Sequence, residues 1–439
     1  MRLLRRTLLA ALLLAVAAYA IWGFIEARRL TADIARIAAR GEPIVPVDRE
    51  TAVLTGEQRD TARIYAAAVE RLQEAPPDEA SQYRRLDVDN PAAPVNLADL
   101  ESRYRKDTPA LQLLDQATPL DFAGFGDVAP ELEARPEPLV ALSALNALRA
   151  DLFSMRGRGD PGAELLVASV RLQRTIRSSL SRYFVSTRVL GSLRILLRNS
   201  RPAESALVRL QRAFEALPDA DTLTRELIES RAQFLDAIAQ PAGTIGAALT
   251  GRLLRPWITS ETRRQLRIFD EAIAFTRGPM PDRFDRAAAF ETKIVGDMKT
   301  SQRRAMFLDW IMSRRRAGFG GTALSSAAYD LAVRRIAIAT LGVERYRRAH
   351  GEALPPSLDG LVPAYLTAVP EDPFSGKPVI YVKGAADYRI YSVDNNRKDD
   401  GGELYGIGSR GQLMPRSGAP RDFGVRVPLT PVADHKEQP

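Results

Sequence analysis

Residues that could bind a metal ion are concentrated in one short stretch near the C-terminus of this 439-residue chain. Residues 394–402 have the sequence Asp-Asn-Asn-Arg-Lys-Asp-Asp-Gly-Gly, which places three carboxylates and two amides in a single loop. Calcium takes carboxylate, amide and carbonyl oxygens as ligands, but Asp, Asn and Gly also make solvated turns that need no ion. The loop is not a standard EF-hand, because Lys398 stands at the fifth position, where a ligand is required. By themselves these residues favour a turn and leave a cation site open as the alternative.

Other site chemistries find no support in the residue types or their spacing. The chain has no cysteine, which excludes disulfides, thiolate nucleophiles and cysteine-based metal centres. Its two histidines, His350 and His435, lie at a predicted helix end and in a polar tail, so no Ser-His-Asp triad or histidine-rich metal centre can be assembled. The pattern Gly-x-Gly-x-x-Gly at 157–162 follows a helical stretch instead of a strand, which argues against dinucleotide binding. No catalytic residue is assigned, and the sequence predicts a protein that is not an enzyme.

A helix, a loop and two short strands must position the acidic stretch. The helix begins near Ser325, and its apolar residues recur at spacings of three and four, as expected for a face that packs on a sheet. That stripe consists of Ala332, Ile336, Ala339, Val343, Tyr346 and His350. Gly351 ends the helix, and the β-favouring runs 379–382 and 388–393 are separated by a loop of about five residues, typical of a hairpin. Together these elements predict one small α+β unit.

Several short motifs occur in a familiar order in this part of the chain. They are Tyr-Arg-Arg-Ala-His-Gly at 346–351, Leu-Pro at 354–355, Pro-Glu-Asp-Pro-Phe-Ser-Gly-Lys-Pro at 370–378 and Tyr-Ser-Val at 391–393. Their order resembles the C-terminal domain of the major pseudopilins of the type II secretion system, over residues 328–403. In that family the loop after the Tyr-Ser strand holds calcium, so the resemblance implies calcium as a cofactor here. The ligands that it implies are the Val393 carbonyl, Asn396, Asp399 and Asp400.

The chain also departs from the pseudopilin pattern. Asn396 stands where the family usually has aspartate, and Asp394 stands where it usually has glycine. The N-terminal sequence Gly-Phe-Ile-Glu at 23–26 imitates a prepilin cleavage site, but the glutamate is misplaced and the apolar run precedes the glycine. Cleavage there would remove the hydrophobic segment, so we do not expect a pilus subunit.

The N-terminus predicts a single membrane anchor. A basic segment, residues 2–6, precedes an uncharged apolar run over 8–25, near the lower end of the roughly 17 to 25 residues that a spanning helix needs. Because its positive charge exceeds that of residues 26–29, the N-terminus should stay in the cytoplasm and the remainder should be exported. The Ala-Tyr-Ala sequence at 18–20 leaves a cleaved signal peptide as an alternative, and either interpretation exports the body.

The sequence between the anchor and the α+β unit is helical. From about 51 to 318, apolar residues recur at helical spacing between Pro, Gly and Asp punctuation. One hairpin is clear, since 139–155 and 160–176 are helical in pattern and Asp160 is a suitable N-cap for the second helix. Further helices are expected over 203–217, 219–238, 260–275 and 282–316. No fixed repeat length is present, so an irregular bundle and stacked helix pairs remain open.

The expected fold is mainly α. Its parts are an N-terminal transmembrane helix (1–30), an all-helical extracytoplasmic domain (31–320), a small pseudopilin-like α+β domain (321–428) and a disordered tail (429–439). A hydrophobic content of 45% and a charged content of 26% are typical of globular proteins. The net charge of +8 comes from arginines scattered along helices, often beside acidic residues, so no nucleic-acid partner is expected.

These features predict a non-enzymatic, single-pass protein of the bacterial inner membrane with most of its mass in the periplasm. It would act through protein partners in the envelope, linked to a type II secretion or pilus-like system, with a calcium-stabilised C-terminal loop. The alternative is an envelope enzyme or ligand-binding protein whose site lies in the helical domain and carries no recognisable motif.

Overall fold

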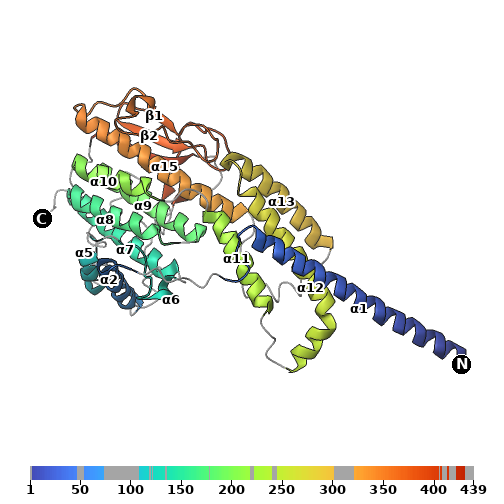
Figure 1. Cartoon of the computed structure of the whole chain (residues 1–439). Helices are drawn as coiled ribbons and strands as arrows, with labels where there is room; N and C mark the ends of the chain where they lie inside the picture. The colour runs from blue at the N-terminus through green and yellow to red at the C-terminus, as the bar shows by residue number, and fades with distance from the viewer. Residues whose placement is uncertain are drawn as a thin grey trace. The chain divides into compact units, whose positions relative to one another are not determined.

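The computed structural model describes residues 2–46, 54–73, 108–117, 120, 122–133, 136–176, 178–217, 222–239, 245–300, 321–404, 406–407, 413–414 and 422–430. These residues are mainly helical, with one long apolar helix at the N-terminus and a small antiparallel sheet near the C-terminus (Figure 1). Contacts group them into two compact units. Unit 1 contains the described residues of Met1–Glu50, Thr224–Gly278 and Arg286–Gly320. Unit 2 contains those of Thr51–Leu223, Pro279–Asp285 and Gly321–Pro439.

Helix α1 (Arg2–Ala39) changes character along its length. Its first part exposes large apolar side chains on every side of the helix; Leu8, near its beginning, is 62% exposed and Ile25, at its end, is 40% exposed. From Gly23 onward one face of the helix is covered by the rest of unit 1, and Glu26 on that face is 5% exposed. The exposed part coincides with the apolar run of the sequence, and the covered part makes α1 an integral element of a folded unit.

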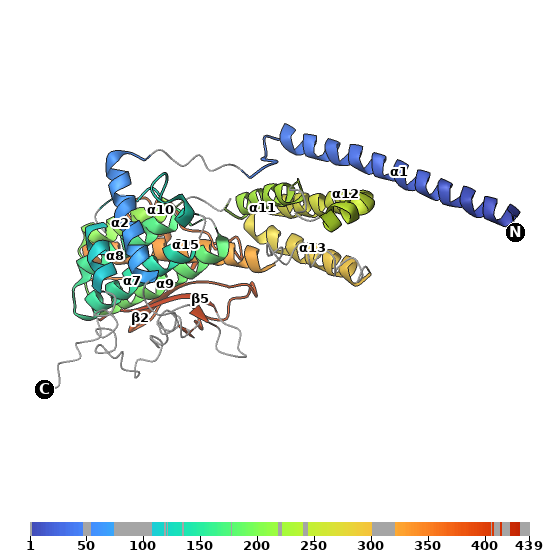
Figure 2. The same cartoon turned by 90° about the horizontal axis from the view of Figure 1, so that it is seen from below.

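Unit 1 is built by α1 together with α11 (Thr222–Ala239), α12 (Ile245–Phe275) and α13 (Met280–Thr300). The first residues of α13, up to Asp285, belong to unit 2. Ile37 of α1 is buried with Leu235 of α11 and Leu266 of α12, and this cluster is the apolar core that joins the three helices. Arg263 of α12 donates to the carboxylates of Glu26 at 2.8 Å and Asp33 at 2.7 Å. Figure 2 shows α1 and α12 side by side.

A buried arginine organises the end of α1 in unit 1. Arg231 of α11 is fully buried and donates to Glu42 and to Asp270 of α12, both at 2.7 Å. Glu42 also accepts from Arg40 at 3.0 Å and from Arg277 at 2.7 Å. Burial alone would raise the pKa of Glu42, but the hydrogen bonds from these arginines outweigh it and lower the pKa below its usual value. The network therefore holds Glu42 ionised and fixes the chain that leaves α1.

Unit 2 stacks its helices in layers and places the sheet on the last one (Figure 1). The helices are α2 (Gly56–Gln73), α5 (Thr108–Ala117), α6 (Pro130–Glu133), α7 (Pro136–Met155), α8 (Gly159–Gln173), α9 (Ser179–Asn199), α10 (Glu204–Glu215) and α15 (Gly321–Ala349). Helix α7 packs on α8 and α9, and α15 packs on α9 and α10. On its other side α15 contacts strand β2.

The α7–α8 hairpin lies close to the predicted position, but its glycines and Asp160 act differently. Helix α8 begins at Gly159 with Arg158 as its N-cap, so the predicted N-cap role of Asp160 is wrong. The Asp160 carboxylate instead accepts the Ala203 N–H at 2.6 Å, where the chain enters α10. A Cβ at Gly159 would lie 2.7 Å from the backbone nitrogen of Pro202. Close packing against Pro202 thus explains the glycine at 159, and a φ of +71° explains the one at 157.

The α+β segment packs directly on the helical layers of unit 2. Asp330 of α15 accepts from Gln173 of α8 at 2.7 Å and pairs with Arg182 of α9 at 3.0 Å. Ser186 of α9 donates to the same carboxylate. These contacts join α15 to α8 and α9. The predicted division at residue 321 between a helical domain and an α+β domain stays a prediction.

The three-stranded sheet has the order β1 (Ile380–Lys383), β2 (Asp387–Ser392) and β5 (Phe423–Pro428), and both pairings are antiparallel. Strands β3 (Gly406–Ile407) and β4 (Leu413–Met414) form a separate two-stranded pair. Strands β1 and β2 correspond to the predicted hairpin, and β5 supplies a further partner for β2. Tyr388 and Ile390 of β2 are fully buried. Residues 431–439 of the predicted tail lie outside the described residues.

Candidate functional site

The motif at 370–378 forms a tight turn around the side chain of Asp372. This residue is 1% exposed, and its carboxylate accepts hydrogen bonds from the Phe374 N–H at 3.1 Å and the Ser375 hydroxyl at 2.8 Å. The Gly376 N–H donates to the Asp372 carbonyl at 2.8 Å, and glycine suits this position because its φ is +69°. The Asp-Pro-x-x-Gly sequence is therefore a turn whose carboxylate caps its own backbone.

The same carboxylate holds the end of β2. The Ser392 hydroxyl donates to Asp372 Oδ1 at 2.6 Å, and the Val393 N–H donates to Asp372 Oδ2 at 3.3 Å. Asp394 follows with a φ of +61°, a conformation that glycine adopts freely and aspartate tolerates. The Tyr329 hydroxyl of α15 donates to the buried Asp394 carboxylate. Two motifs that are separate in the sequence thus meet at one buried side chain.

The side chains of the acidic loop, residues 394–402, bond to one another and to the sheet. Asn396 Nδ2 donates to Asp400 Oδ2 at 2.8 Å. Asp399 Oδ1 accepts from the Tyr391 hydroxyl at 3.1 Å and from the Gly401 N–H at 2.9 Å. Of the predicted ligands, Asn396 is exposed and Val393 is 7% exposed. Hydrogen bonds within the loop and one from Tyr391 of the sheet hold these side chains.

Asp422 closes the loop from the far side, and the sequence did not identify it. Its carboxylate is fully buried and accepts the Gly402 N–H at 2.7 Å and the Asp400 N–H at 3.1 Å. Burial raises the pKa of Asp422 to about 6, partly opposed by those two hydrogen bonds and increased by the negative charges of Asp399 and Asp400. Three carboxylates therefore influence one another at this edge of the sheet.

The predicted ligands have the oxygen chemistry that calcium requires. Their oxygens already take part in the loop: Asn396 Oδ1 accepts the Lys398 N–H at 2.9 Å, so a cation would share or replace such donors. Arg397 of the same loop pairs with Asp285 of α13 at 2.7 Å. Over the described ranges, no group of three or more His, Cys, Asp or Glu side chains is arranged to hold a metal ion. The residue types fit calcium, and the assignment of Val393, Asn396, Asp399 and Asp400 stays a prediction.

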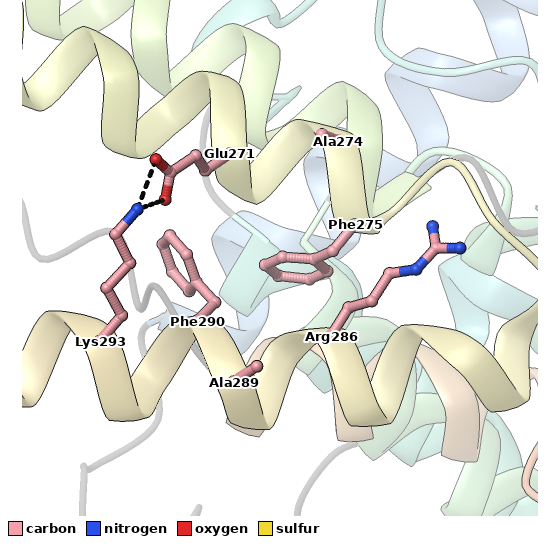
Figure 3. A pocket seen from close by; sticks show the side chains of 7 residues that line it. All are labelled: Glu271, Ala274, Phe275, Arg286, Ala289, Phe290 and Lys293. Carbon is pink, nitrogen blue, oxygen red and sulfur yellow. Dashed lines mark hydrogen bonds and ion pairs between the residues drawn. The ribbon is translucent and has the colours of Figure 1, made fainter.

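A hollow of about 360 Å³ lies between α12 and α13 in unit 1 (Figure 3). Its floor is apolar, with the Phe275 and Phe290 rings 5.5 Å apart between centroids, and Ala274 and Ala289 beside them. At one end Lys293 pairs with Glu271 at 2.8 Å, and Arg286 lies at the other. An apolar floor with the cationic Arg286 at one end and the Lys293–Glu271 ion pair at the other suits an amphipathic molecule whose negative charge faces Arg286. No motif in the sequence points to this hollow.

Comparison with known proteins gives no relative for this chain. No family model matches it, and no curated protein or solved structure is significantly similar to it.

Proposed function

We propose that this protein is a single-pass protein of the bacterial inner membrane, with its N-terminus in the cytoplasm and both folded units in the periplasm. The observation that carries the proposal is the change of character along α1. Among the described residues, α1 is the one helix long and apolar enough to cross a membrane, and its most apolar stretch is unburied. Large apolar side chains exposed all round a helix are stable in lipid and costly in water.

The orientation follows from the charges that flank the apolar run. The basic residues 2–6 favour the cytoplasmic side, and the segment after the run carries a smaller excess of positive charge. Arg263 further neutralises Glu26 and Asp33 in the part of α1 that leaves the membrane. Helix α1 therefore has two roles: its apolar part anchors the chain, and its continuation is part of the folded unit 1.

We further propose that the protein is a non-enzymatic interaction module of the cell envelope, associated with a type II secretion or pilus-like system. Support comes from the pseudopilin-like order of motifs in 328–403 and from their meeting at Asp372. The test is affinity purification of the full chain from solubilised membranes in calcium, with retained proteins identified by mass spectrometry. Recovery of pseudopilins or of their assembly platform is expected, and recovery of the chain alone would remove the link to secretion.

Calcium is proposed to stabilise the acidic loop. A cation would offset the mutual repulsion of Asp399, Asp400 and Asp422, which contributes to the raised pKa of Asp422. Thermal unfolding of the full chain with calcium and with chelator tests this, since a ligand at 100 times its dissociation constant adds about 2.7 kcal/mol. The calcium effect should vanish in the double variant Asp399→Ala, Asp400→Ala and persist in Asp359→Ala, a control at an exposed position of unit 2. If the wild type unfolds at the same temperature with calcium and with chelator, the loop is a turn that binds no calcium.

The second candidate function is ligand binding in the hollow between α12 and α13. An anilinonaphthalene sulfonate probe combines aromatic rings with a negative charge and so matches the apolar floor and the cationic Arg286 of this site. Probe fluorescence should rise with the wild type and fall with Ala289→Trp, which fills the floor. Equal fluorescence with both proteins would leave the hollow without a ligand role.

A further inference from the structure

Helices α1 and α12 run parallel within unit 1. Their contacts advance together along both helices, from Gly23 with Pro256, through Glu26 with Arg263, to Arg40 with Asp270. The approach at the first of these contacts is close, because a Cβ at Gly23 would lie 2.8 Å from Cγ of Pro256. The first turns of α12 precede Pro256 and therefore extend from this contact toward the apolar end of α1.

This geometry brings α12 to the level of the membrane boundary. Gly23 belongs to the last turn of the apolar run that ends at residue 25. Tyr19 and Trp22, with ring centroids 5.6 Å apart, lie at the same level, as aromatic residues do where a helix leaves the hydrocarbon. Figure 1 shows the first turns of α12 bending away from α1, and the interior proline is the expected cause of such a bend. The bend therefore places these turns at the boundary between the hydrocarbon and water, beside the end of the apolar run.

The residues of these turns have the composition of an interfacial helix. Residues 245–260 contain no carboxylate, and their charges are those of Arg252 and Arg255. At helical spacing, large apolar residues recur every four positions, at Ile245, Leu249, Leu253 and Trp257. Leu254 and Arg255 lie on the surface of unit 1 and are exposed. Apolar residues combined with arginines and no acidic residue suit acyl chains together with anionic headgroups.

We propose that the first turns of α12, residues 245–256, lie in the interfacial region of the bilayer that α1 crosses and bind anionic phospholipid. The inference rests on the proposed membrane anchor. Unit 1 would then touch the membrane twice, through the spanning helix and through α12, and the Gly23–Pro256 contact would set the angle between them. The second contact restricts rotation of unit 1 about the axis of α1.

The chain offers its own depth probe, because its three tryptophans can be separated by substitution. The full chain is reconstituted in vesicles of phosphatidylcholine and phosphatidylglycerol whose acyl chains carry bromine near the glycerol end or near the methyl end. In the variant Trp22→Phe, Trp310→Phe, Trp257 is the one remaining tryptophan, and selective excitation of tryptophan over tyrosine reports on it alone. Bromine near the glycerol end is expected to quench Trp257 most, because an interfacial helix lies at the headgroup boundary. Quenching should weaken in vesicles of phosphatidylcholine alone.

The variant Trp257→Phe, Trp310→Phe leaves Trp22 as a report on the anchor. Quenching of Trp22 without quenching of Trp257 overturns the interfacial assignment and leaves the anchor in place. If neither tryptophan is quenched, both the anchor and the inference are overturned. Leu254→Glu should reduce quenching of Trp257 and leave that of Trp22 unchanged. Leu180→Glu, at a similarly exposed leucine of unit 2, is the matched control. Unchanged quenching of Trp257 in Leu254→Glu contradicts insertion of this helix.

Discussion

Replacing Asp372 with alanine removes the acceptor on which the pseudopilin-like motifs converge. The change leaves the N–H groups of Phe374 and Val393 and the hydroxyls of Ser375 and Ser392 without this partner. The hydroxyls can turn to other acceptors, but the two N–H groups are fixed by the backbone. Leaving a buried donor unsatisfied costs about 1 to 3 kcal/mol, so the variant should lose roughly 3 to 5 kcal/mol of unfolding free energy around β2.

Hydrogen–deuterium exchange of the full chain, followed by mass spectrometry, measures this loss locally. Each 1.4 kcal/mol is a factor of about ten in an equilibrium constant, so peptides that cover β2 should exchange about a hundredfold to a few thousandfold faster. Asp372→Asn keeps one acceptor oxygen, so its β2 peptides should exchange at a rate between those of Asp372→Ala and the wild type. Asp387→Ala, at the other end of β2, removes only a partly exposed pair with Arg426 at 3.6 Å and serves as the control. Equal exchange in Asp372→Ala and Asp387→Ala would refute the reasoning.

Three further predictions concern pH, a buried ion pair and a glycine. Burial raises the pKa of Asp422 from its usual value of 3.8 to about 6 in the folded chain, so its contribution to stability is fully present below pH 3.8 and is lost as pH rises through 6. The stability of Asp422→Asn relative to wild type, measured by denaturant unfolding, should therefore grow by about 2 kcal/mol between pH 4 and pH 7. Arg231→Met leaves the part-buried carboxylate of Glu42 with fewer partners and should cost about 2 kcal/mol in thermal or denaturant unfolding. Gly159→Ala should cost about 1 to 3 kcal/mol, because its Cβ would meet the backbone of Pro202.

Each of these predictions has an outcome that contradicts it. Parallel pH profiles for Asp422→Asn and the wild type would show that the ionisation of Asp422 is not coupled to folding. An unchanged free energy of unfolding in Arg231→Met would mean that Arg40 and Arg277 satisfy the Glu42 carboxylate without Arg231. For the glycine, Gly56→Ala is the control, since a Cβ there has open space and alanine is the better helix former. A loss in Gly56→Ala equal to that in Gly159→Ala would rule out the steric explanation.

Apolar periodicity located most of the described helices. It failed at proline, which can either end a helix or bend it. The apolar pattern predicted 203–217 and 219–238, close to α10 and α11. The expected start of a helix at 260 was wrong, because α12 begins at Ile245 and continues through Pro256. Proline usually ends a helix, and only tertiary packing, here against Gly23, shows that this one bends it instead. Strand β5 also escaped prediction, since 423–428 pairs with β2 across about thirty intervening residues, a distance that local pattern does not report.

The acidic loop was recognised from its residue types, but the residues that organise it were not. Asp372 and Asp422 lie far from 394–402 in the sequence, and both carboxylates act on backbone N–H groups, which leave no signature in side-chain spacing. Asp372 was inside a quoted motif, yet its partners Ser392 and Val393 depend on how the turn meets β2. The packing of α15 through Asp330 was equally unpredictable, because an isolated aspartate on a helix indicates a solvated face.

The most direct test of the central claim is the side of the membrane on which the folded units lie. The absence of native cysteine allows single-cysteine labelling without background, with Asp359→Cys at an exposed site of unit 2 and Leu3→Cys before the apolar run. A membrane-impermeant maleimide added to intact spheroplasts should modify Asp359→Cys at once and Leu3→Cys only after lysis. Modification of Asp359→Cys only after lysis would place the folded units in the cytoplasm and contradict the account.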